Sequence, residues 1–224
     1  MTVAHHHHGA PAALAPAQKT PAWKLLVTLA IAGAAAGLLV VSVYRLTLPA
    51  IQKYAAVKAD AAVREVLKSP ARWDTLYLVK GALVTSVAEE AQRRELPKAF
   101  VGFDQDGKRV GVAITAEGPG FQEILSMMIG FDPATGALLG IRVLDEKETP
   151  GLGDKIETDK SFLAQFTGRV APVVGTRVKP GDGTSQVQTI TGATISSRAV
   201  IRIVNAAVAR WRPLVNELEH GGAR

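Results

Sequence analysis

The segment TITGATISSRAV, residues 189–200, holds the residues best suited to chemistry. Thr191 and Thr194 flank a Gly-Ala pair where a helix is expected to begin. A helix N-terminus has free N–H groups and a partial positive charge, which suit a phosphate, and Gly192 would let a ligand or a modifying enzyme approach. The same residues also fit a plain helix cap, because threonine caps well and glycine allows a tight turn. The residues alone leave both interpretations open.

The segment does not fit two common catalytic motifs. A phosphate-binding loop needs a longer glycine-rich loop with a lysine before its serine or threonine. A serine hydrolase needs a histidine partner, and outside the tract His5–His8 the sequence has only His220. We expect His220 on the solvated surface. We expect His5–His8, a tag or a chance tract, in a disordered Ala/Pro-rich tail without functional metal binding.

Composition limits how this chain could hold a redox group. Its 224 residues include no cysteine, which excludes disulfides, thiolate zinc sites, iron–sulfur clusters and thioether-linked haem. The formal net charge is +6 at pH 7, but the basic residues are scattered and aromatic residues make up only 5%. Nucleic-acid binding needs clustered basic side chains and stacking rings, so we expect no nucleic-acid partner. Hydrophobic residues make up 47%, enough for the core of one ordinary domain.

A membrane-spanning helix is predicted over residues 25–44. This segment has no charged residue, and its length in a helix matches a hydrocarbon core of about 30 Å. Trp23 and Tyr44 lie at its edges, where amphipathic rings favour the membrane interface. A cleaved signal peptide fits less well, because the apolar run is long and no clear cleavage site follows. Lysine and arginine lie on both sides of the span, so charge gives no orientation, although a large following domain is compatible with export.

One face of this span is rich in small residues, which would let a partner membrane helix approach closely. The face consists of Ala30, Gly33, Ala34 and Gly37. A stalk helix is expected to follow over residues 45–70, interrupted near Pro49 and stopped by Ser69-Pro70.

An α+β domain built on an antiparallel sheet is predicted over residues 71–215. Residues 100–103 and 110–114 flank the turn pair Asp106-Gly107, and residues 126–131 and 137–144 flank a second turn, which predicts two hairpins. A short helix is expected at 160–166.

An amphipathic helix is expected from Thr194, disturbed late by Pro213. Its apolar stripe, expected to pack in the core, consists of Val200, Val204, Val208 and Trp211. Residues 1–24 and 216–224 are predicted to be tails.

The segment EKETPGLGDKIE, residues 146–157, is predicted to be an irregular loop because it contains Pro150, Gly151 and Gly153. Such a loop either brings its backbone close to a flat ligand or forms an ordinary surface turn.

Two motifs together resemble a known family. ETPGLGDKI followed by TITGATISS, after one N-terminal span, is similar to the FMN-binding G subunit of the Rnf electron-transport complex and, less closely, to the C subunit of the sodium-pumping NADH:quinone reductase. The resemblance covers residues 25–212. It implies a phosphoester between FMN and Thr194, at the end of the run that begins with Thr191, Gly192 and Ala193. It also implies that the isoalloxazine ring lies against Glu148, Thr149, Gly151 and Leu152.

The resemblance further implies an electron relay within a redox-driven ion translocase, not catalytic alone. Its partners would be the other membrane subunits and a flavin transferase, and it would lie in a bacterial inner membrane with the domain in the periplasm. Gln188 stands where the family usually has Asp, which predicts weaker recognition by the transferase. Should Thr194 not carry the flavin, Thr191 or Ser196 would be next. A stand-alone anchored flavoprotein and a non-redox anchored binding domain remain alternatives.

Overall fold

A computed structural model describes residues 21–88, 96–181 and 183–221 of the chain. The predicted tract His5–His8 and the side chain of His220 lie outside the described part. The chain divides into two compact units, Met1–Gln52 and Lys53–Arg224.

Helix α1, Ala22–Val66, provides the predicted span and most of the predicted stalk. By length and composition it is able to cross a membrane, since the mean hydropathy of its most apolar window is 2.4. The predicted interruption near Pro49 is wrong, because α1 continues through this residue. Pro49 is exposed, and a proline removes only one intrahelical hydrogen bond, so the turns on either side keep the helix continuous.

The second unit contains a six-stranded antiparallel sheet in the order β2-β1-β3-β4-β5-β6. Its strands are β1 Arg72–Val79, β2 Ala82–Val84, β3 Lys98–Phe103, β4 Arg109–Pro119, β5 Ile124–Phe131 and β6 Leu138–Asp145. Both predicted hairpins are confirmed as β3–β4 and β5–β6. The sequence analysis missed β1 and β2, which join through Lys80 and Gly81, both at positive φ.

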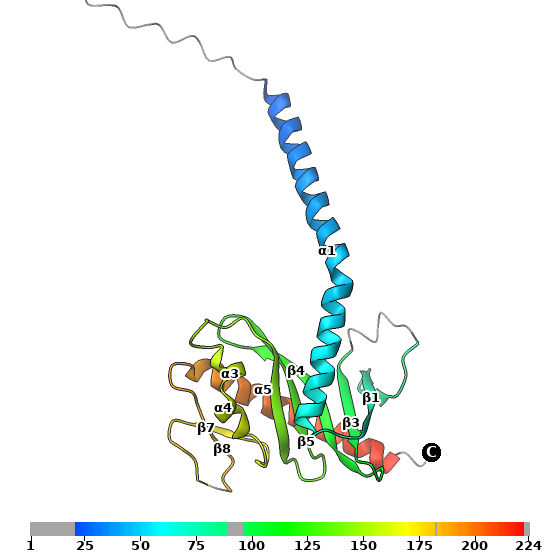
Figure 1. Ribbon diagram of the computed structural model, residues 1–224, viewed down its shortest axis with the longest axis vertical. Coiled ribbons are helices and arrows are strands. Elements are labelled where there is room, and N and C mark those ends of the chain that lie inside the picture. The colour runs from blue at the N-terminus through cyan, green and yellow to red at the C-terminus, as the bar shows by residue number, and fades with distance from the viewer. Residues whose placement is uncertain (1–20, 89–95, 182, 222–224) are drawn as a thin grey trace, which may run out of the picture. The chain divides into compact units, whose positions relative to one another are not determined.

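Helices cover both faces of this sheet (Figure 1). Helix α5, Thr194–Gly221, packs on one face, together with α3, Lys155–Thr158, and α4, Lys160–Ala164. The C-terminal end of α1, which includes Ala62, Val63 and Val66 and is called its foot below, packs on the other face. Side chains alternate along a strand, so Val112 and Ile114 of β4 belong to the α5 side and Ala113 to the α1 side. A short parallel pair, β7 Val174–Thr176 and β8 Gln186–Gln188, lies beside α5.

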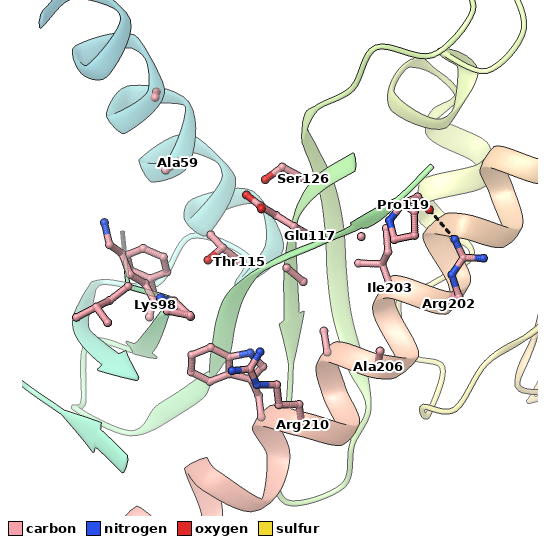
Figure 2. Close-up of a pocket in the computed structure, with 18 residues that line it drawn as sticks. Ala59, Lys98, Thr115, Glu117, Pro119, Ser126, Arg202, Ile203, Ala206 and Arg210 are labelled. Atoms are coloured by element: carbon pink, nitrogen blue, oxygen red, sulfur yellow. Dashed lines mark hydrogen bonds between the residues drawn. The ribbon is translucent and has the colours of Figure 1, made fainter. Parts of the chain in front are cut away.

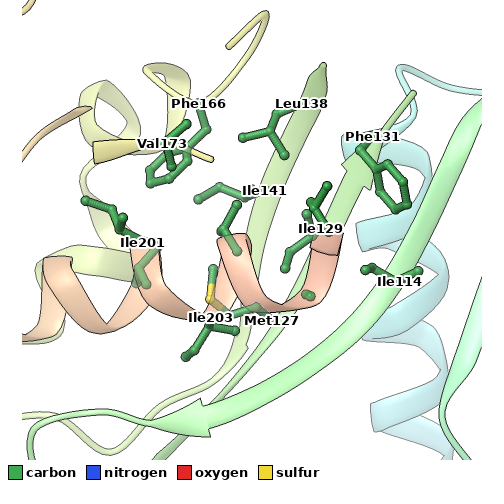
Figure 3. Close-up of a cluster of buried hydrophobic side chains, with 14 of the residues drawn as sticks. Ile114, Met127, Ile129, Phe131, Leu138, Ile141, Phe166, Val173, Ile201 and Ile203 are labelled. Carbon is green, nitrogen blue, oxygen red and sulfur yellow. The ribbon is translucent and has the colours of Figure 1, made fainter. Parts of the chain in front are cut away.

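The main core lies between the sheet and α5 (Figure 3). The predicted apolar stripe of α5, from Val200 to Trp211, is buried there as expected. The helix also continues past Pro213 to Gly221, so most of the predicted tail 216–224 is helical. Pro213 is exposed, and Arg212 and Asn216 donate side-chain hydrogen bonds to the carbonyl oxygen of Pro133, which hold this end of the helix on the β5–β6 turn.

The foot of α1 lies close to the sheet because neighbouring strands have glycines beneath it. A Cβ atom on Gly130 would lie 2.6 Å from the carbonyl oxygen of Val66, and one on Gly102 would lie 2.7 Å from a methyl of Leu67. Val66 and Leu67 are buried, and the helix ends where Lys68 takes a positive φ of 58°. The foot of this helix is thus part of the folded domain, whose predicted boundary was residue 71.

Replacing Gly130 with alanine tests this close approach. The added methyl group would meet backbone atoms of Val66, which are unable to move aside as a flexible side chain would. We expect Gly130→Ala to lower the free energy of unfolding by about 1–3 kcal/mol. Urea denaturation of the full chain in detergent measures this loss. Gly181→Ala is the control, because its Cβ would have only an ordinary 3.9 Å contact, and equal stability of the two variants would contradict the packing.

Asp159 caps α4 and should make stability pH-dependent. Its carboxylate accepts hydrogen bonds from the hydroxyl of Ser161 and from the N–H groups of Ser161 and Phe162. The Ser161 hydroxyl is the main cause that lowers the pKa of Asp159 below its ordinary value. The stabilisation is therefore complete above the unfolded pKa of about 3.9 and is lost as pH falls through the lower native pKa.

We expect Asp159→Ala to cost about 1 kcal/mol at pH 7 and less as the pH falls below 4. Asp159→Asn should keep most of the cap without this pH dependence. Chemical denaturation of the three proteins at pH 3 and pH 7 measures both effects. A cost of Asp159→Ala that is the same at both pH values would contradict the assignment.

Candidate functional site

The predicted helix start at Thr194 is confirmed. The N–H of Ser197 donates to the carbonyl oxygen of Ala193 at 2.9 Å, which is the first helical hydrogen bond of α5. The N–H groups of Thr194, Ile195 and Ser196 therefore have no intrahelical acceptor. Thr194 is half-buried, and its hydroxyl has no hydrogen-bond partner within the described part of the chain. An alcohol thus lies beside three N–H groups that are able to bind an anion.

The turn before α5 is open on its outer side. Gly192 has a φ of +86°, a conformation that strains any residue with a side chain. A Cβ atom there would contact only a methyl group of Leu152, at 3.6 Å. Thr191 and Gly192 are exposed, whereas Ala193 is buried. The two predicted motifs, far apart in the sequence, therefore meet at Gly192 and Leu152.

Ser197 holds the turn from inside. Its hydroxyl accepts a hydrogen bond from the N–H of Ile190 at 3.1 Å and donates one to the carbonyl oxygen of Ala193 at 2.8 Å. The side chain is fully buried, with 0% exposure. This serine therefore fixes both ends of the turn Ile190–Ala193, and the sequence analysis assigned it no role.

Glu148 joins three segments of the chain. Its Oε2 accepts a hydrogen bond from the hydroxyl of Ser196 at 2.7 Å. Its Oε1 accepts from the N–H groups of Phe121 at 2.8 Å and Gln122 at 3.3 Å, in the β4–β5 turn. Glu148 is 5% exposed and Ser196 is 3% exposed. The carboxylate predicted to lie against a flavin ring thus accepts three hydrogen bonds from other parts of the protein.

Two glycines make room for this carboxylate. A Cβ on Gly120 would collide with Oε1 of Glu148, and one on Gly153 would lie 2.8 Å from Oε2 and 3.1 Å from the hydroxyl of Ser196. The second glycine of each of the segments GPG and PGLG therefore serves close packing around Glu148. Gly120 was the available sequence signal for the β4–β5 turn, which the sequence analysis did not include in the site.

The predicted irregular loop is a compact turn. The carbonyl oxygen of Thr149 accepts hydrogen bonds from the N–H groups of Leu152 at 3.1 Å and Gly153 at 2.9 Å, and Gly151 takes a φ of +77°. The hydroxyl of Thr149 accepts from the side-chain amide of Gln122 at 2.6 Å. The tip of the turn, at Gly151 and Leu152, is exposed. Glu148, Leu152 and Gly153 of the predicted loop therefore lie at the start of α5. The last residues of the predicted loop, from Lys155, are not irregular but belong to helix α3.

Comparisons with known proteins agree with this geometry. Residues 120–209 match the family model of the FMN-binding domain. A protein from Escherichia coli O157:H7, named as the G subunit of an ion-translocating oxidoreductase complex, is 32% identical over 186 residues, which cover 81% of this chain and 86% of that protein. A protein of the same name from Methanosarcina acetivorans is 29% identical over 83% of this chain and 92% of its own length. The chain belongs to the family of these G subunits.

The fold of this family member also occurs in a solved structure. The crystal structure of Shewanella oneidensis NqrC covers 70% of this chain and 88% of its own, with a TM-score of 0.55 and 20% identity. At this identity the likeness shows only that the two proteins share a fold.

The surroundings of Thr194 fit a flavin mononucleotide. The three N–H groups without an intrahelical acceptor and the open turn at Gly192 are able to receive a phosphate. Large apolar side chains are exposed on the three segments that Glu148 joins: Phe121 is 59% exposed, Leu152 49% and Ile195 59%. A flat, mostly apolar ring is the kind of ligand that such side chains cover. The N–H groups thus suit the phosphate of FMN, and the exposed apolar side chains suit its ring.

The basic residues of α5 contribute less to this site. Arg202 donates a hydrogen bond to the carbonyl oxygen of Pro119 at 2.5 Å, and Arg198 is exposed. Gln188, which stands where the resemblance predicts an aspartate, donates from its side-chain amide to the carbonyl oxygen of Arg177 at 3.3 Å. A carboxylate in its place would be unable to donate this hydrogen bond.

A groove of about 950 Å³ lies away from this site. It is bordered by the foot of α1, the start of β3, the end of β4 and helix α5 (Figure 2), and its lining includes Ala59, Lys98, Glu117 and Arg210. Neither Thr194 nor Glu148 lines it. This groove is therefore separate from the site around Thr194.

Removing the Ser197 hydroxyl tests the inner support of the turn. Ser197→Ala would leave the N–H of Ile190 and the carbonyl oxygen of Ala193 without this partner in a buried place. We expect a loss of about 1–3 kcal/mol in the free energy of unfolding, measured by chemical denaturation. Ser185→Ala, at an exposed position, is the control and should change stability little. If both substitutions have the same small effect, Ser197 does not support the turn.

Proposed function

We propose that this chain carries FMN in a phosphoester with Thr194 and relays electrons as the membrane-anchored G subunit of an ion-translocating (Rnf) oxidoreductase complex. The observation that carries the proposal is the hydroxyl of Thr194, in the first turn of α5 and next to an open glycine turn, which has no hydrogen-bond partner among the residues that the structure describes. Membership in the family of G subunits and the match to the FMN-binding domain support it.

Attachment requires an activated phosphate, because an alcohol and a free phosphate do not condense readily in water. The Thr194 oxygen forms the new O–P bond, its proton passes to solvent, and a P–O–P bond of the donor breaks. The donor is therefore a flavin dinucleotide, and a nucleoside monophosphate leaves. We assign this transfer to a flavin transferase, since the described residues around Thr194 include no histidine or lysine within hydrogen-bonding reach of its hydroxyl.

Once attached, FMN would supply the electron-transfer chemistry. The chain would supply position: N–H groups at the start of α5 hold the phosphate, and Leu152, Phe121 and Ile195 shield the ring from water. No acid or base of the chain is needed to pass electrons alone. A covalent bond would also keep the cofactor on a domain that faces a compartment where free flavin is scarce.

We further propose that α1 anchors the chain in a bacterial inner membrane as a single span, with the FMN-binding domain in the periplasm. The apolar part of α1 and the names of the relatives support a membrane complex. The other membrane subunits would be its partners, and the small-residue face from Ala30 to Gly37 is the proposed contact for one of their helices.

Replacing Thr194 tests the attachment. The full chain is produced with a flavin transferase, and flavin fluorescence in a denaturing gel and intact mass are measured. We expect wild type to retain flavin and Thr194→Ala to lose all of it, because the accepting oxygen is gone. Thr191→Ala is the matched control, since this threonine is in the same turn but precedes the helix, and it should retain flavin.

Two outcomes would contradict the proposal. Flavin that remains on Thr194→Ala would show that it is attached to another residue, and Thr191 and Ser196 would be the next candidates. A colourless wild-type protein of unmodified mass, matured beside an active transferase, would favour a non-redox anchored binding domain. Co-purification with membrane subunits distinguishes a complex subunit from a stand-alone flavoprotein.

A further inference from the structure

We infer that Glu148 and Ser196 are positioning residues for flavin attachment: their hydrogen bond holds the first turn of α5 so that the Thr194 hydroxyl faces the incoming phosphate. This inference rests on the proposed function of Thr194. It assigns to Glu148 a task inside the protein, instead of the contact with the flavin ring that the resemblance implies.

The geometry of the first turn couples the two side chains. Ser196 follows Thr194 by two residues, so in a helix the two side chains point about 200° apart. Ser196 is buried and bonded to Glu148 at 2.7 Å, whereas Thr194 is half-buried and its hydroxyl has no partner in the described segments. Holding Ser196 inward therefore fixes the rotation of the helix start and turns Thr194 outward.

The other end of the bond is firmly fixed. Glu148 Oε1 accepts from the N–H groups of Phe121 and Gln122, which belong to the rigid β4–β5 connection. Gly120 and Gly153 pack against the carboxylate so closely that added side chains would collide with it. Glu148 is thus unable to shift without moving the sheet turn, and Ser196 receives a defined partner.

Position matters here because attachment is a reaction of one oxygen with one phosphorus atom. A displacement of about 1 Å of a reacting group can lower a rate by about 100-fold. Ser196→Ala removes the hydroxyl bonded to Glu148 and leaves the backbone of α5 intact. Glu148→Met keeps nearly the size of the side chain, but its thioether is only a weak hydrogen-bond acceptor and no donor, so the hydrogen bond with Ser196 is lost.

The experiment measures flavin transfer to the full chain by a purified flavin transferase, with a flavin dinucleotide as donor. We expect Ser196→Ala and Glu148→Met each to lower kcat for transfer about tenfold. KM for the chain should stay within about twofold, because the exposed surface that the transferase contacts is unchanged. The double variant should be no slower than the slower single variant, because both substitutions break the same hydrogen bond.

Glu123→Met is the matched control. Glu123 lies in the β4–β5 turn, but its carboxylate is exposed and pairs with Lys147 at 2.9 Å. The same chemical change there should leave kcat and KM unchanged. Melting temperatures of all variants show whether each is folded, and if Ser196→Ala is not, Glu148→Met alone decides.

Wild-type kcat in Glu148→Met, or single effects that multiply in the double variant, would overturn the inference while leaving the proposed function intact. An equal loss in the Glu123→Met control would also overturn it. Failure of the proposed function is a separate result, since wild type would then carry no flavin on Thr194 at all.

Discussion

The buried carboxylate of Glu148 is the constraint on which the site depends. A buried charge is costly unless hydrogen bonds satisfy it, and here they come from two N–H groups of the β4–β5 turn and from the Ser196 hydroxyl. Satisfying one carboxylate therefore requires three segments to meet. The same meeting brings Leu152 beside Gly192 and leaves Thr194 at an open surface.

The sheet supports this arrangement from both faces. On one face, α5 buries its apolar stripe from Val200 to Trp211, which fixes the helix whose first residue is Thr194. On the other face, Gly130 and Gly102 let the foot of α1 lie directly on the strands. The strands thus carry the start of α5 and the end of the anchor helix within one folded unit, so the position of Thr194 follows from packing and not from loop chemistry alone.

Sequence patterns predicted the local elements, and not the contacts between them. The turn pair Asp106-Gly107 and the helical spacing of Val200 and Val204 are local signals, and both elements are present. The β1–β2 hairpin was missed because its turn, Lys80-Gly81, is not a typical turn pair. The bond from Ser196 to Glu148 joins residues 48 positions apart, so no periodicity reveals it. Pro49 misled the prediction because an exposed helix tolerates one missing hydrogen bond.

The central claim is that one oxygen atom, the Thr194 hydroxyl, holds the flavin. The most direct measurement is fragmentation mass spectrometry of the tryptic peptide 178–198 from protein matured with a flavin transferase. This peptide contains Thr184, Ser185, Thr189, Thr191, Thr194, Ser196 and Ser197. The account predicts that every fragment containing residue 194 has the added mass of FMN and that fragments ending before it do not. Added mass that maps to any other residue, or an unmodified peptide, would contradict it.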